Sequence, residues 1–461
     1  MNFLRNCNFI KGVGIGLIAL TSSGCLIKGL KSNVDTTTSP AAKVDRPPQY
    51  VMMAFDGSYD QIMWDNVLKH SRELTADKKP VHWTIFLSCV YYLWRNGTEH
   101  GSGTSGMYHC PHIKNGIKEE NCPYDDTNPD ANAATRGRAC LGNADNQNDV
   151  LLRVEKTNQA KLEGHEIGSH SCSHCGGDVY SQDQWESEFS QFDRFVFGAI
   201  RENGITESMI GKEKVSLVTA ADVLGFRAPF LKFKKENLWP VLKKHGFIYD
   251  TSSPDGGSPG TWPKKVDGIW EYPLALLKIA GTNDHTMSMD YNFYYYDQSK
   301  NIGPAQAEEQ MYKSYMNYFM QSYYSNGNGN GTQGNRAPIH IGHHYSGWNG
   351  AAYWKALKRF STQVCGMPEV KCVTYKELTD FMNATPPETL KAYQEGKFEK
   401  LLAPQSQSLS LADSFELSDI DDAKIDPTRT FSVDEWNAMG VKTVVPPKRC
   451  GDGEEVPVPR D

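Results

Sequence analysis

The sequence has little that would suit a nucleic-acid-binding protein or a protein embedded in a membrane. Its 461 residues contain 48 Lys and Arg against 55 Asp and Glu, so it lacks the basic excess with which proteins approach a phosphate backbone. After the N-terminal region, no segment is apolar enough to span a bilayer, which needs about 20 residues. Internal repeats are absent as well. We therefore expect no nucleic acid among its partners and no membrane-spanning body.

The N-terminus has the form of a secretory signal. A short apolar run at residues 13–20 follows basic residues and leads through small residues to Cys25. The run is too short to cross a bilayer, so residues 1–24 are predicted to be a signal peptide. The residues before Cys25 resemble a bacterial lipoprotein processing site, with Ser22 where such sites usually carry Leu. We expect an exported protein, periplasmic or extracellular, either tethered to a membrane through a lipidated Cys25 or cleaved nearby without lipid.

Of the 11 cysteines, ten remain from Cys25 onward, or nine if Cys25 carries lipid, and these are disulfide candidates because an exported chain meets an oxidising environment. Several lie around one polar insertion, residues 95–148, which is long enough to be functional and which we expect to border the substrate cleft. Another pair, Cys365 and Cys372, flanks a short loop. The spacings by themselves favour no single pairing scheme.

Four regions follow one another along the chain. After the signal peptide, residues 26–47 are rich in Thr, Ser and Pro and are predicted to be a flexible linker. Residues 48–384 alternate short apolar runs with amphipathic stretches, and residues 385–461 form an acidic extension. The alternation predicts an α/β domain with a mainly parallel sheet, open or closed, of a size normal for a single α/β barrel. The expected helices span residues 58–74, 150–163, 181–203, 234–245, 304–324 and 350–362.

The stretch "GHEIGSHSCSHCGG" at residues 164–177 contains the clearest candidate metal ligands. His170 and His174 stand four apart, so at helical spacing both imidazoles would project to one face and bind one cation. With 13 histidines such a pair also arises readily by chance. The cysteines between and after them are less suitable as ligands, because four ligands within six residues are far more tightly spaced than in known zinc sites. We expect those cysteines to form disulfides or to be buried.

Other polar residues follow predicted strands. Asp56 ends the apolar run "YVMMAF", where α/β barrels place catalytic groups, although a helix cap or a turn would explain it as well. Arg227, in "GFRAPFL", could fix a carboxylate through two hydrogen bonds. Asp250 ends another apolar stretch. In "IHIGHHYSGW", His343 shares a strand face with Ile341, whereas His344 lies on the opposite face.

The order of these pieces resembles that of the polysaccharide deacetylases of carbohydrate esterase family 4. It runs from a strand-end Asp through HSxxH, RxPF and a second strand-end Asp to an aliphatic-x-His, and it covers about residues 48–384. "GHEIGSHSCSH", "FRAPFL" and "GIWEYPL" look most like the subgroup that contains arthropod chitin deacetylases, and exported peptidoglycan deacetylases are similar. The resemblance implies a distorted (β/α) barrel with a cysteine-rich loop insertion.

The resemblance also implies roles for individual residues. Asp56 matches the general base, Arg227 the residue that orients it, and His343 the general acid, with His344 as a close competitor because the strand register is uncertain by one residue. The remaining matched positions form the metal site, the oxyanion site, the acetyl pocket and the tuning carboxylate. They are His170 and His174 (metal, usually zinc), Ser171 (bracing their loop), the backbone N–H of Phe230 (oxyanion), Ile341 (wall of the acetyl pocket) and Asp250 (tuning).

One departure from the family pattern bears on the metal. The first motif normally has two adjacent aspartates, the second of which binds the metal, but here Gly57 follows Asp56. Either two histidines and water hold the metal, or Asp60 joins them, or Asp56 binds the metal instead of acting as base, or the activity is lost.

The leading hypothesis from the sequence is a metal-dependent N-deacetylase, with Zn²⁺ as the expected ion. Its substrate would be an N-acetylated polysaccharide, most plausibly peptidoglycan and otherwise a chitin-like glycan. A glycan-binding lipoprotein on a decayed deacetylase barrel is the second hypothesis, because the second Asp is missing. A third keeps the enzyme but makes it an O-acetyl polysaccharide esterase.

Overall fold

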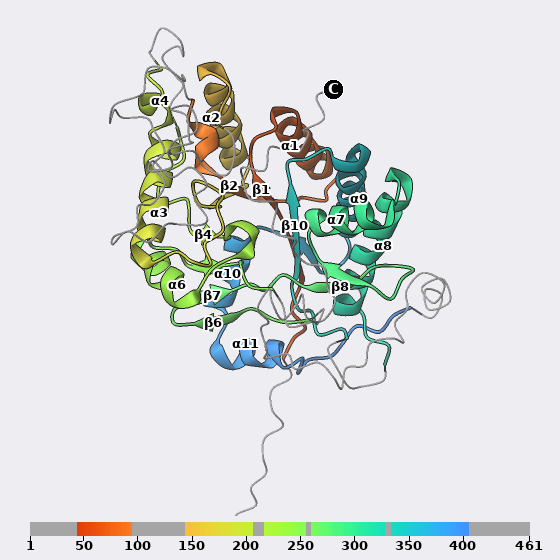
Figure 1. The fold of residues 1–461 in the computed structure, drawn as a ribbon. Helices are drawn as coiled ribbons and strands as arrows, with labels where there is room; N and C mark the ends of the chain where they lie inside the picture. The colour runs from red at the N-terminus through yellow and green to blue at the C-terminus, as the bar shows by residue number, and fades with distance from the viewer. Residues whose placement is uncertain (1–43, 95–142, 206–215, 255–259, 328–332, 405–461) are drawn as a thin grey trace, which may run out of the picture. The chain divides into compact units, whose positions relative to one another are not determined.

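The computed structural model describes residues 44–94, 143–205, 216–254, 260–327 and 333–404 (Figure 1). The predicted signal peptide, Cys25, nearly all of the 26–47 linker, most of the cysteine-rich insertion and the extension beyond residue 404 lie outside these residues, so the predictions about them stay predictions. No helix in the described ranges has the length and apolarity that a membrane crossing requires.

A single large sheet forms the centre of the molecule. Its strands follow the order β10-β1-β2-β3-β4-β5-β7-β6, and β11 also pairs with β1. All neighbours are parallel except β6 and β7. The strands are β1 (Gln49–Gly57), β2 (Thr84–Leu87), β3 (Glu166–Ser169), β4 (Gly225–Phe226), β5 (Tyr249–Asp250), β6 (Lys264–Val266), β7 (Ile269–Glu271), β10 (Ile339–His344) and β11 (Val370–Cys372). Two further strands, β8 (Leu276–Lys278) and β9 (His285–Met287), form a separate hairpin.

The sheet is curled so strongly that its two sides face each other. β10 and β7 lie six strand positions apart, which in a flat sheet would separate them by about 29 Å at about 4.8 Å per strand. The ring of Tyr272, directly after β7, nevertheless lies 5.6 Å from the ring of His340 on β10. The predicted distorted α/β barrel with a mainly parallel sheet is therefore confirmed.

Helices cover the outside of the curled sheet, with α2, α3 and α6 on one side and α7, α8 and α9 on the other (Figure 1). Each of the six helices expected from the sequence is present, with its ends shifted by a few residues. The helices are α1 (Gln61–Ala76), α2 (Gln147–Leu162), α3 (Gln182–Phe197), α4 (Ala199–Glu202), α6 (Lys235–Lys244), α7 (Asp290–Lys300), α8 (Pro304–Tyr323), α9 (Trp348–Val364), α10 (Tyr375–Ala384) and α11 (Pro387–Gln394), with short 3₁₀ turns η1 (Cys89–Tyr92) and η2 (Pro229–Leu231).

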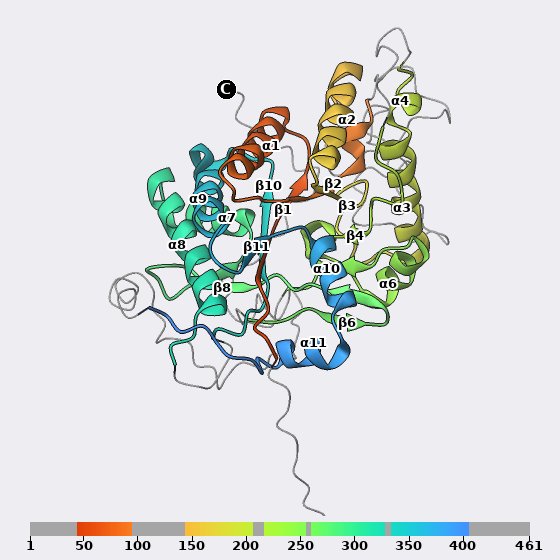
Figure 2. The same ribbon diagram turned by 180° about the vertical axis from the view of Figure 1, so that it is seen from behind.

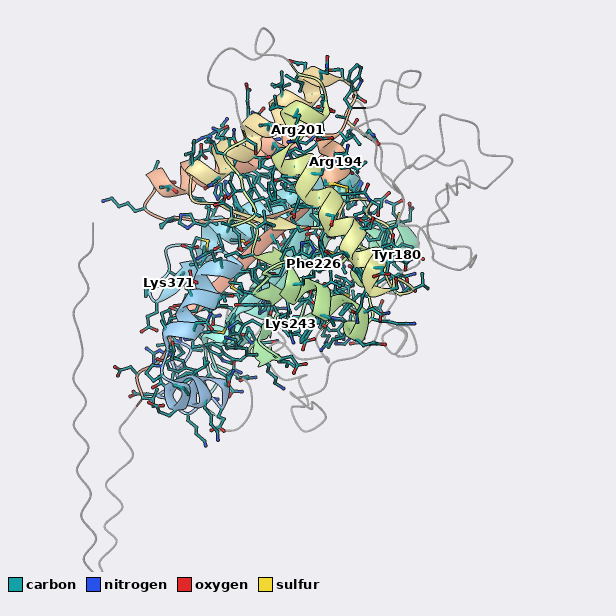
Figure 3. The ribbon with its side chains drawn as sticks, turned by 90° about the vertical axis from the view of Figure 1, so that its left-hand side faces the viewer. Tyr180, Arg194, Arg201, Phe226, Lys243 and Lys371 are labelled. Atoms are coloured by element: carbon teal, nitrogen blue, oxygen red, sulfur yellow. A yellow bond between two sulfur atoms is a disulfide. The ribbon has the colours of Figure 1, made fainter. Side chains whose placement is uncertain are left out.

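Strand alternation divides the buried residues into two sets. One set, which includes Phe55 of β1 and Phe226 of β4, packs between the sheet and the outer helices; Phe226 is labelled in Figure 3, the view from the side of α3 and α6. The other set fills the inside of the barrel and includes Met52, Phe86 and Tyr249. A residue's position along its strand therefore decides whether its side chain faces the barrel interior or the helices.

Two helices that the sequence pattern did not predict pack on the set that fills the barrel. α10 begins with a capping box between Thr374 and Glu377, and α11 follows it on the same side of the molecule (Figure 2). The ring of Tyr393 on α11 stacks at 6.0 Å from that of Trp262. The packed core thus continues past residue 384, where the α/β domain was expected to end.

A polar network lies inside the barrel beneath the strand ends. The carboxylate of Glu166 accepts hydrogen bonds from the Thr84 hydroxyl at 2.9 Å, the Tyr249 hydroxyl at 2.9 Å and the backbone N–H of Lys376 at 3.0 Å. The last donor belongs to the first turn of α10, where unpaired N–H groups favour a carboxylate. Burial raises the pKa of Glu166 to about 7.

This network predicts a measurable pH dependence of stability. Because the folded pKa of Glu166 exceeds its ordinary value of 4.5, the folded protein keeps a proton that the unfolded chain releases. The contribution of Glu166 to the free energy of unfolding should therefore fall as pH rises from about 4.5 to about 7, by up to about 3 kcal/mol at about 1.4 kcal/mol per unit.

Urea unfolding of the wild type and the Glu166→Gln variant across this range measures the effect. As pH rises, the free energy of unfolding of the wild type should fall relative to that of the Glu166→Gln variant. The exposed Glu73→Gln variant serves as the control and should follow the wild type. A constant difference between wild type and Glu166→Gln from pH 4.5 to 7 would contradict the prediction.

Candidate functional site

Four of the predicted site residues lie at one end of the barrel, where the parallel strands terminate. Asp56 is the penultimate residue of β1 and is the register partner of His344 at the end of β10. His170 and Arg227 directly follow β3 and β4. Because parallel strands carry their carboxyl ends to the same rim, residues far apart in the sequence converge there.

The two candidate metal ligands lie side by side. The ring centroids of His170 and His174 are 4.9 Å apart, and the Nδ1 of His170 donates to the carbonyl oxygen of Arg227 at 2.7 Å. That bond leaves the Nε2 of His170 as the lone-pair nitrogen, the arrangement found where a metal-binding imidazole is held by a backbone carbonyl. Burial lowers the pKa of His170 to about 4 and lowers that of His174 as well, so both rings are neutral near pH 7.

The backbone around these histidines differs from the expected helical spacing. The segment after β3 is a loop, and Ser171 and His174 adopt left-handed conformations, with φ of 59° and 58°. Glu188 of α3, rather than the hydroxyl of Ser171, braces this loop by accepting the backbone N–H groups of Cys172 and Ser173, both at 2.9 Å. The imidazoles meet because the loop is anchored, not because it is helical.

A disulfide joins Cys172 to Cys89 in η1, and Cys175 is disulfide-bonded too. Cys365 and Cys372 form another disulfide across the short loop that they flank. The expectation that the cysteines of "HSCSHC" serve the architecture rather than a metal is therefore confirmed. No motif in the sequence indicates Glu188. The only hint of its role is that a Glu stands on the apolar side of a predicted helix.

Asp56 and Arg227 form a buried ion pair across the barrel. The Arg227 Nη1 donates to Asp56 Oδ1 at 2.8 Å, and the two side chains are 0% and 2% exposed, respectively. The other end of the guanidinium is held by the Tyr375 hydroxyl at 3.0 Å, and its plane lies 4.6 Å from the ring centre of Phe86. Arg227 thus orients Asp56 and is itself held on three sides.

His344 faces this ion pair and carries its own carboxylate. Asp290, the first residue of α7, accepts a hydrogen bond from His344 Nδ1 at 2.7 Å and another from the His344 backbone N–H at 2.8 Å. Burial by itself lowers the pKa of His344, but the Asp290 carboxylate outweighs it, and the net shift is upward. The imidazole can therefore hold a proton that its Nε2 presents to the site.

The positions of His343 and Ile341 correct the expectation from the sequence. Both alternate to the opposite face of β10 and point toward the helices. The Nε2 of His343 lies 3.1 Å from the Tyr315 hydroxyl of α8, and burial lowers its pKa to about 4. One residue of strand alternation thus puts His344, not His343, on the side of Asp56, and Ile341 in the outer core rather than at an acetyl pocket.

Asp250 also faces away from Asp56. It shares the outward face of the sheet with Phe226, its carboxylate accepts the indole N–H of Trp239 on α6 at 3.0 Å, and it bonds the hydroxyl of Ser252. Burial raises its pKa to about 6. The carboxylate that tunes a site imidazole is therefore Asp290, which no motif in the sequence pointed to; a strand-end Asp in "HTMSMD" was its only signal.

Two further predicted residues are placed as follows. Asp60 is the N-cap of α1, and its carboxylate accepts the backbone N–H of Met63 at 2.8 Å, so a structural bond occupies it. The ring of Phe230 lies 4.7 Å from that of His174, and its backbone is left-handed, with φ of 54°. Phe230 belongs to the site region, whereas Asp60 has a capping role.

The residues present fit half of a metal site. His170 and His174 have the spacing, burial and neutral state that a divalent ion requires, and the buried Nδ1 of His174 has no hydrogen-bond partner within the described ranges. No group of three or more His, Cys, Asp or Glu side chains in those ranges is arranged to hold a metal ion. Gly57, which follows Asp56, adds no ligand side chain to the imidazole pair.

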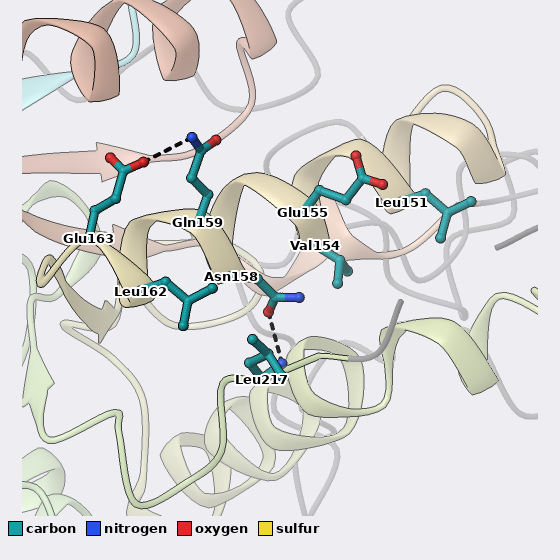
Figure 4. A pocket seen from close by; sticks show the side chains of 8 residues that line it. All are labelled: Leu151, Val154, Glu155, Asn158, Gln159, Leu162, Glu163 and Leu217. Atoms are coloured by element: carbon teal, nitrogen blue, oxygen red, sulfur yellow. Dashed lines mark hydrogen bonds between the residues drawn. The ribbon is translucent and has the colours of Figure 1, made fainter. Parts of the chain in front are cut away.

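A surface pocket lies elsewhere on the molecule and contains none of these residues. It runs along α2 opposite Leu217, whose backbone N–H donates to Asn158 at 2.8 Å (Figure 4). Its lining residues are Leu151, Val154, Glu155, Asn158, Gln159, Leu162, Glu163 and Leu217.

No protein-family model and no curated protein matches the sequence. Solved structures with a similar fold include a candidate polysaccharide deacetylase from Mycobacterium smegmatis, at 14% identity and a TM-score of 0.41 over 80% of this chain and 98% of that one. The peptidoglycan deacetylase of Bacillus subtilis is similar at 10% identity and a TM-score of 0.32, over 74% of this chain and 94% of that one. A family 4 carbohydrate esterase pseudoenzyme from Bacillus anthracis is similar at 10% identity and a TM-score of 0.33, over 72% of this chain and 65% of that one.

The structures similar to this chain thus include carbohydrate esterase family 4 proteins.

The Asp290–His344 pair predicts that the pKa of His344 shifts when Asp290 is replaced. Replacing Asp290 by Asn removes the negative charge that favours the imidazolium, so the pKa of His344 should fall. Titration of the histidine ring signals by NMR measures this directly. The Asp297→Asn variant is a matched control, because Asp297 lies on the same helix but bonds the Tyr353 hydroxyl instead. An unchanged His344 pKa in Asp290→Asn would contradict the assignment.

Proposed function

We propose that this protein is an exported polysaccharide deacetylase that removes the acetyl group from N-acetylglucosamine residues of peptidoglycan or a chitin-like glycan. The convergence of Asp56, held by Arg227, and His344, held by Asp290, on one rim carries the proposal. A proton acceptor and a proton donor face each other there, beside two neutral imidazoles.

The proposed reaction is hydrolysis of an amide. The Asp56 carboxylate takes a proton from the attacking water, whose oxygen bonds the acetyl carbon while the carbonyl oxygen gains the negative charge. His344 donates its proton to the sugar nitrogen as the C–N bond breaks, which releases acetate and leaves a free amine. Arg227 keeps Asp56 in place, and Asp290 keeps His344 protonated until that step.

A divalent ion, with Zn²⁺ as the proposed one, would be held by His170 and His174 and would activate the water and polarise the acetyl carbonyl. The imidazole of His174 lies against Phe230, whose backbone N–H is the proposed second donor to the oxyanion.

An alternative function is glycan binding without turnover. The observation that favours it is Gly57, which has no side chain to offer a metal ion, at a place where no group of three or more potential ligand side chains in the described ranges is arranged to hold one. An O-acetyl esterase is a further alternative on the same residues, because the same acceptor and donor serve ester hydrolysis. Export, with or without a lipid on Cys25, is compatible with both an N-acetylated and an O-acetylated polysaccharide as substrate.

Acetate release tests the activity. The full chain, with added Zn²⁺, should release acetate from peptidoglycan or N-acetylglucosamine oligomers, and Asp56→Asn and His344→Gln should each lower kcat by about 10²–10⁴-fold. His343→Gln should retain kcat in the folded fraction, because the His343 side chain lies on the opposite face of β10, 3.1 Å from the Tyr315 hydroxyl and no closer than 3.6 Å to the Asp290 carboxylate. Release from acetyl-xylan alone would favour the esterase. No release from any of these substrates would refute the proposal.

Zinc binding, measured by calorimetry, separates the possible roles of Asp56. His170→Ala and His174→Ala should abolish binding, whereas exposed His285→Ala should not. If Asp56→Asn keeps zinc but loses turnover, Asp56 is the base; if it loses zinc as well, Asp56 is a ligand.

Gly57 can be tested in the same assay. A Cβ at this position would meet only the Tyr91 ring at 3.9 Å, although a φ of 98° makes any side chain there strained. Gly57→Asp should tighten zinc binding at least about tenfold, or ~1.4 kcal/mol, relative to Gly57→Asn, which has the same shape without the charge. Equal affinities in the two variants would show that residue 57 does not face the ion.

A further inference from the structure

Two helices place three partly exposed aromatic rings beside His344. Tyr291 and Tyr294 come from the first turns of α7, and Trp348 begins α9. The rings of Tyr294 and Trp348 stack at 5.2 Å with 20° between their planes, and Tyr291 meets Trp348 at 5.5 Å. Trp348 in turn lies 5.3 Å from the His344 imidazole. We call Tyr291, Tyr294 and Trp348 the aromatic ledge.

The ledge differs from the other aromatic residues of the same helices. Phe293, Tyr353 and Trp354 are buried in the core between sheet and helices, whereas the three ledge residues stay partly exposed. The indole N–H of Trp348 makes no hydrogen bond to any described residue. Partly exposed aromatic rings with an unused donor are suited to a ligand that has both an apolar face and hydroxyl groups.

The backbone directly after Trp348 adopts strained conformations that are not those of an α-helix. Asn349, Gly350 and Ala351 all adopt left-handed conformations, with φ of 50°, 64° and 59°. Successive residues of this kind are disfavoured for L-amino acids, and such strain persists where the surrounding structure fixes it, often at binding sites. Asn349 donates to the Ile302 carbonyl at 3.3 Å, which holds the turn and with it the place of Trp348.

We propose that the aromatic ledge is a sugar-binding subsite that stacks on the pyranose ring next to the residue being deacetylated. The C–H face of a neutral N-acetylated sugar would lie on Trp348 and Tyr294, and its hydroxyls would reach the ledge's polar edges. The proposal rests on the proposed function for the position of this sugar beside His344, but glycan binding to the ledge does not require turnover. It makes Trp348 a determinant of the preferred glycan length.

Calorimetric titration of the full chain with the N-acetylglucosamine tetramer tests the ledge, with acetate release followed in parallel. Trp348→Leu keeps an apolar side chain but removes the aromatic face, and it should weaken binding at least tenfold. Trp348→Phe should restore affinity to within about threefold of the wild type. Tyr296→Leu is the control, because Tyr296 lies on α7 with Tyr291 and Tyr294 but contacts Asp284 and Lys300 instead of the ledge.

The outcomes separate the ledge from the activity. Tetramer binding that depends on Trp348 but proceeds without acetate release would support the ledge and refute the deacetylase. Equal tetramer affinity in Trp348→Leu and wild type, or no binding by the wild type, would overturn the ledge. Thermal unfolding checks each variant, and Tyr294→Leu provides the same test if Trp348→Leu does not fold.

Discussion

The buried ion pair between Asp56 and Arg227 is the constraint on which the site depends. It joins the ends of β1 and β4, three strand positions apart, and it can form only because the sheet is curled. Taking two charges out of water is costly unless they are paired and hydrogen-bonded. Here the guanidinium also bonds the Tyr375 hydroxyl and lies over the Phe86 ring, whereas its buried Nε has no hydrogen-bond partner among the described residues. The curl therefore provides more than a scaffold, because it brings a carboxylate and its orienting cation together in the buried interior of the barrel.

The same barrel separates two kinds of environment at neighbouring residues. Asp290 lies 3.6 Å from the Nδ1 of His343 and 2.7 Å from the Nδ1 of His344, yet burial among the outer helices lowers the pKa of His343, whereas the hydrogen-bonded carboxylate raises that of His344. Helix α7 supplies both that carboxylate and two of the rings of the aromatic ledge. Proton donation and glycan contact would thus be organised by one segment, which links the geometry of the reaction to the geometry of recognition.

The part of the site that was predictable was encoded in short motifs at strand ends. Asp56, His170, His174 and Arg227 were identified because each follows an apolar run or forms a close pair, and the structure brings these four to one rim. Asp290 and Glu188 could not be identified, because neither stands in a recognisable spacing and each acts through a contact with a distant segment. His344 was retained only as a competitor, since alternation shows which residues share a face but not which face is inside.

The sequence by itself determined the alternation of strands and helices, the six main helices and the identity of the candidate metal ligands, since these follow from local hydrophobic periodicity and residue chemistry. Tertiary structure alone decided that Asp250 faces Trp239 on the outside, that His344 and not His343 faces Asp56, and that Asp60 caps a helix instead of joining the imidazole pair. The physical reason is that the closure of the whole sheet decides which face of each strand points into the barrel, and strands far apart in the chain contribute to that closure.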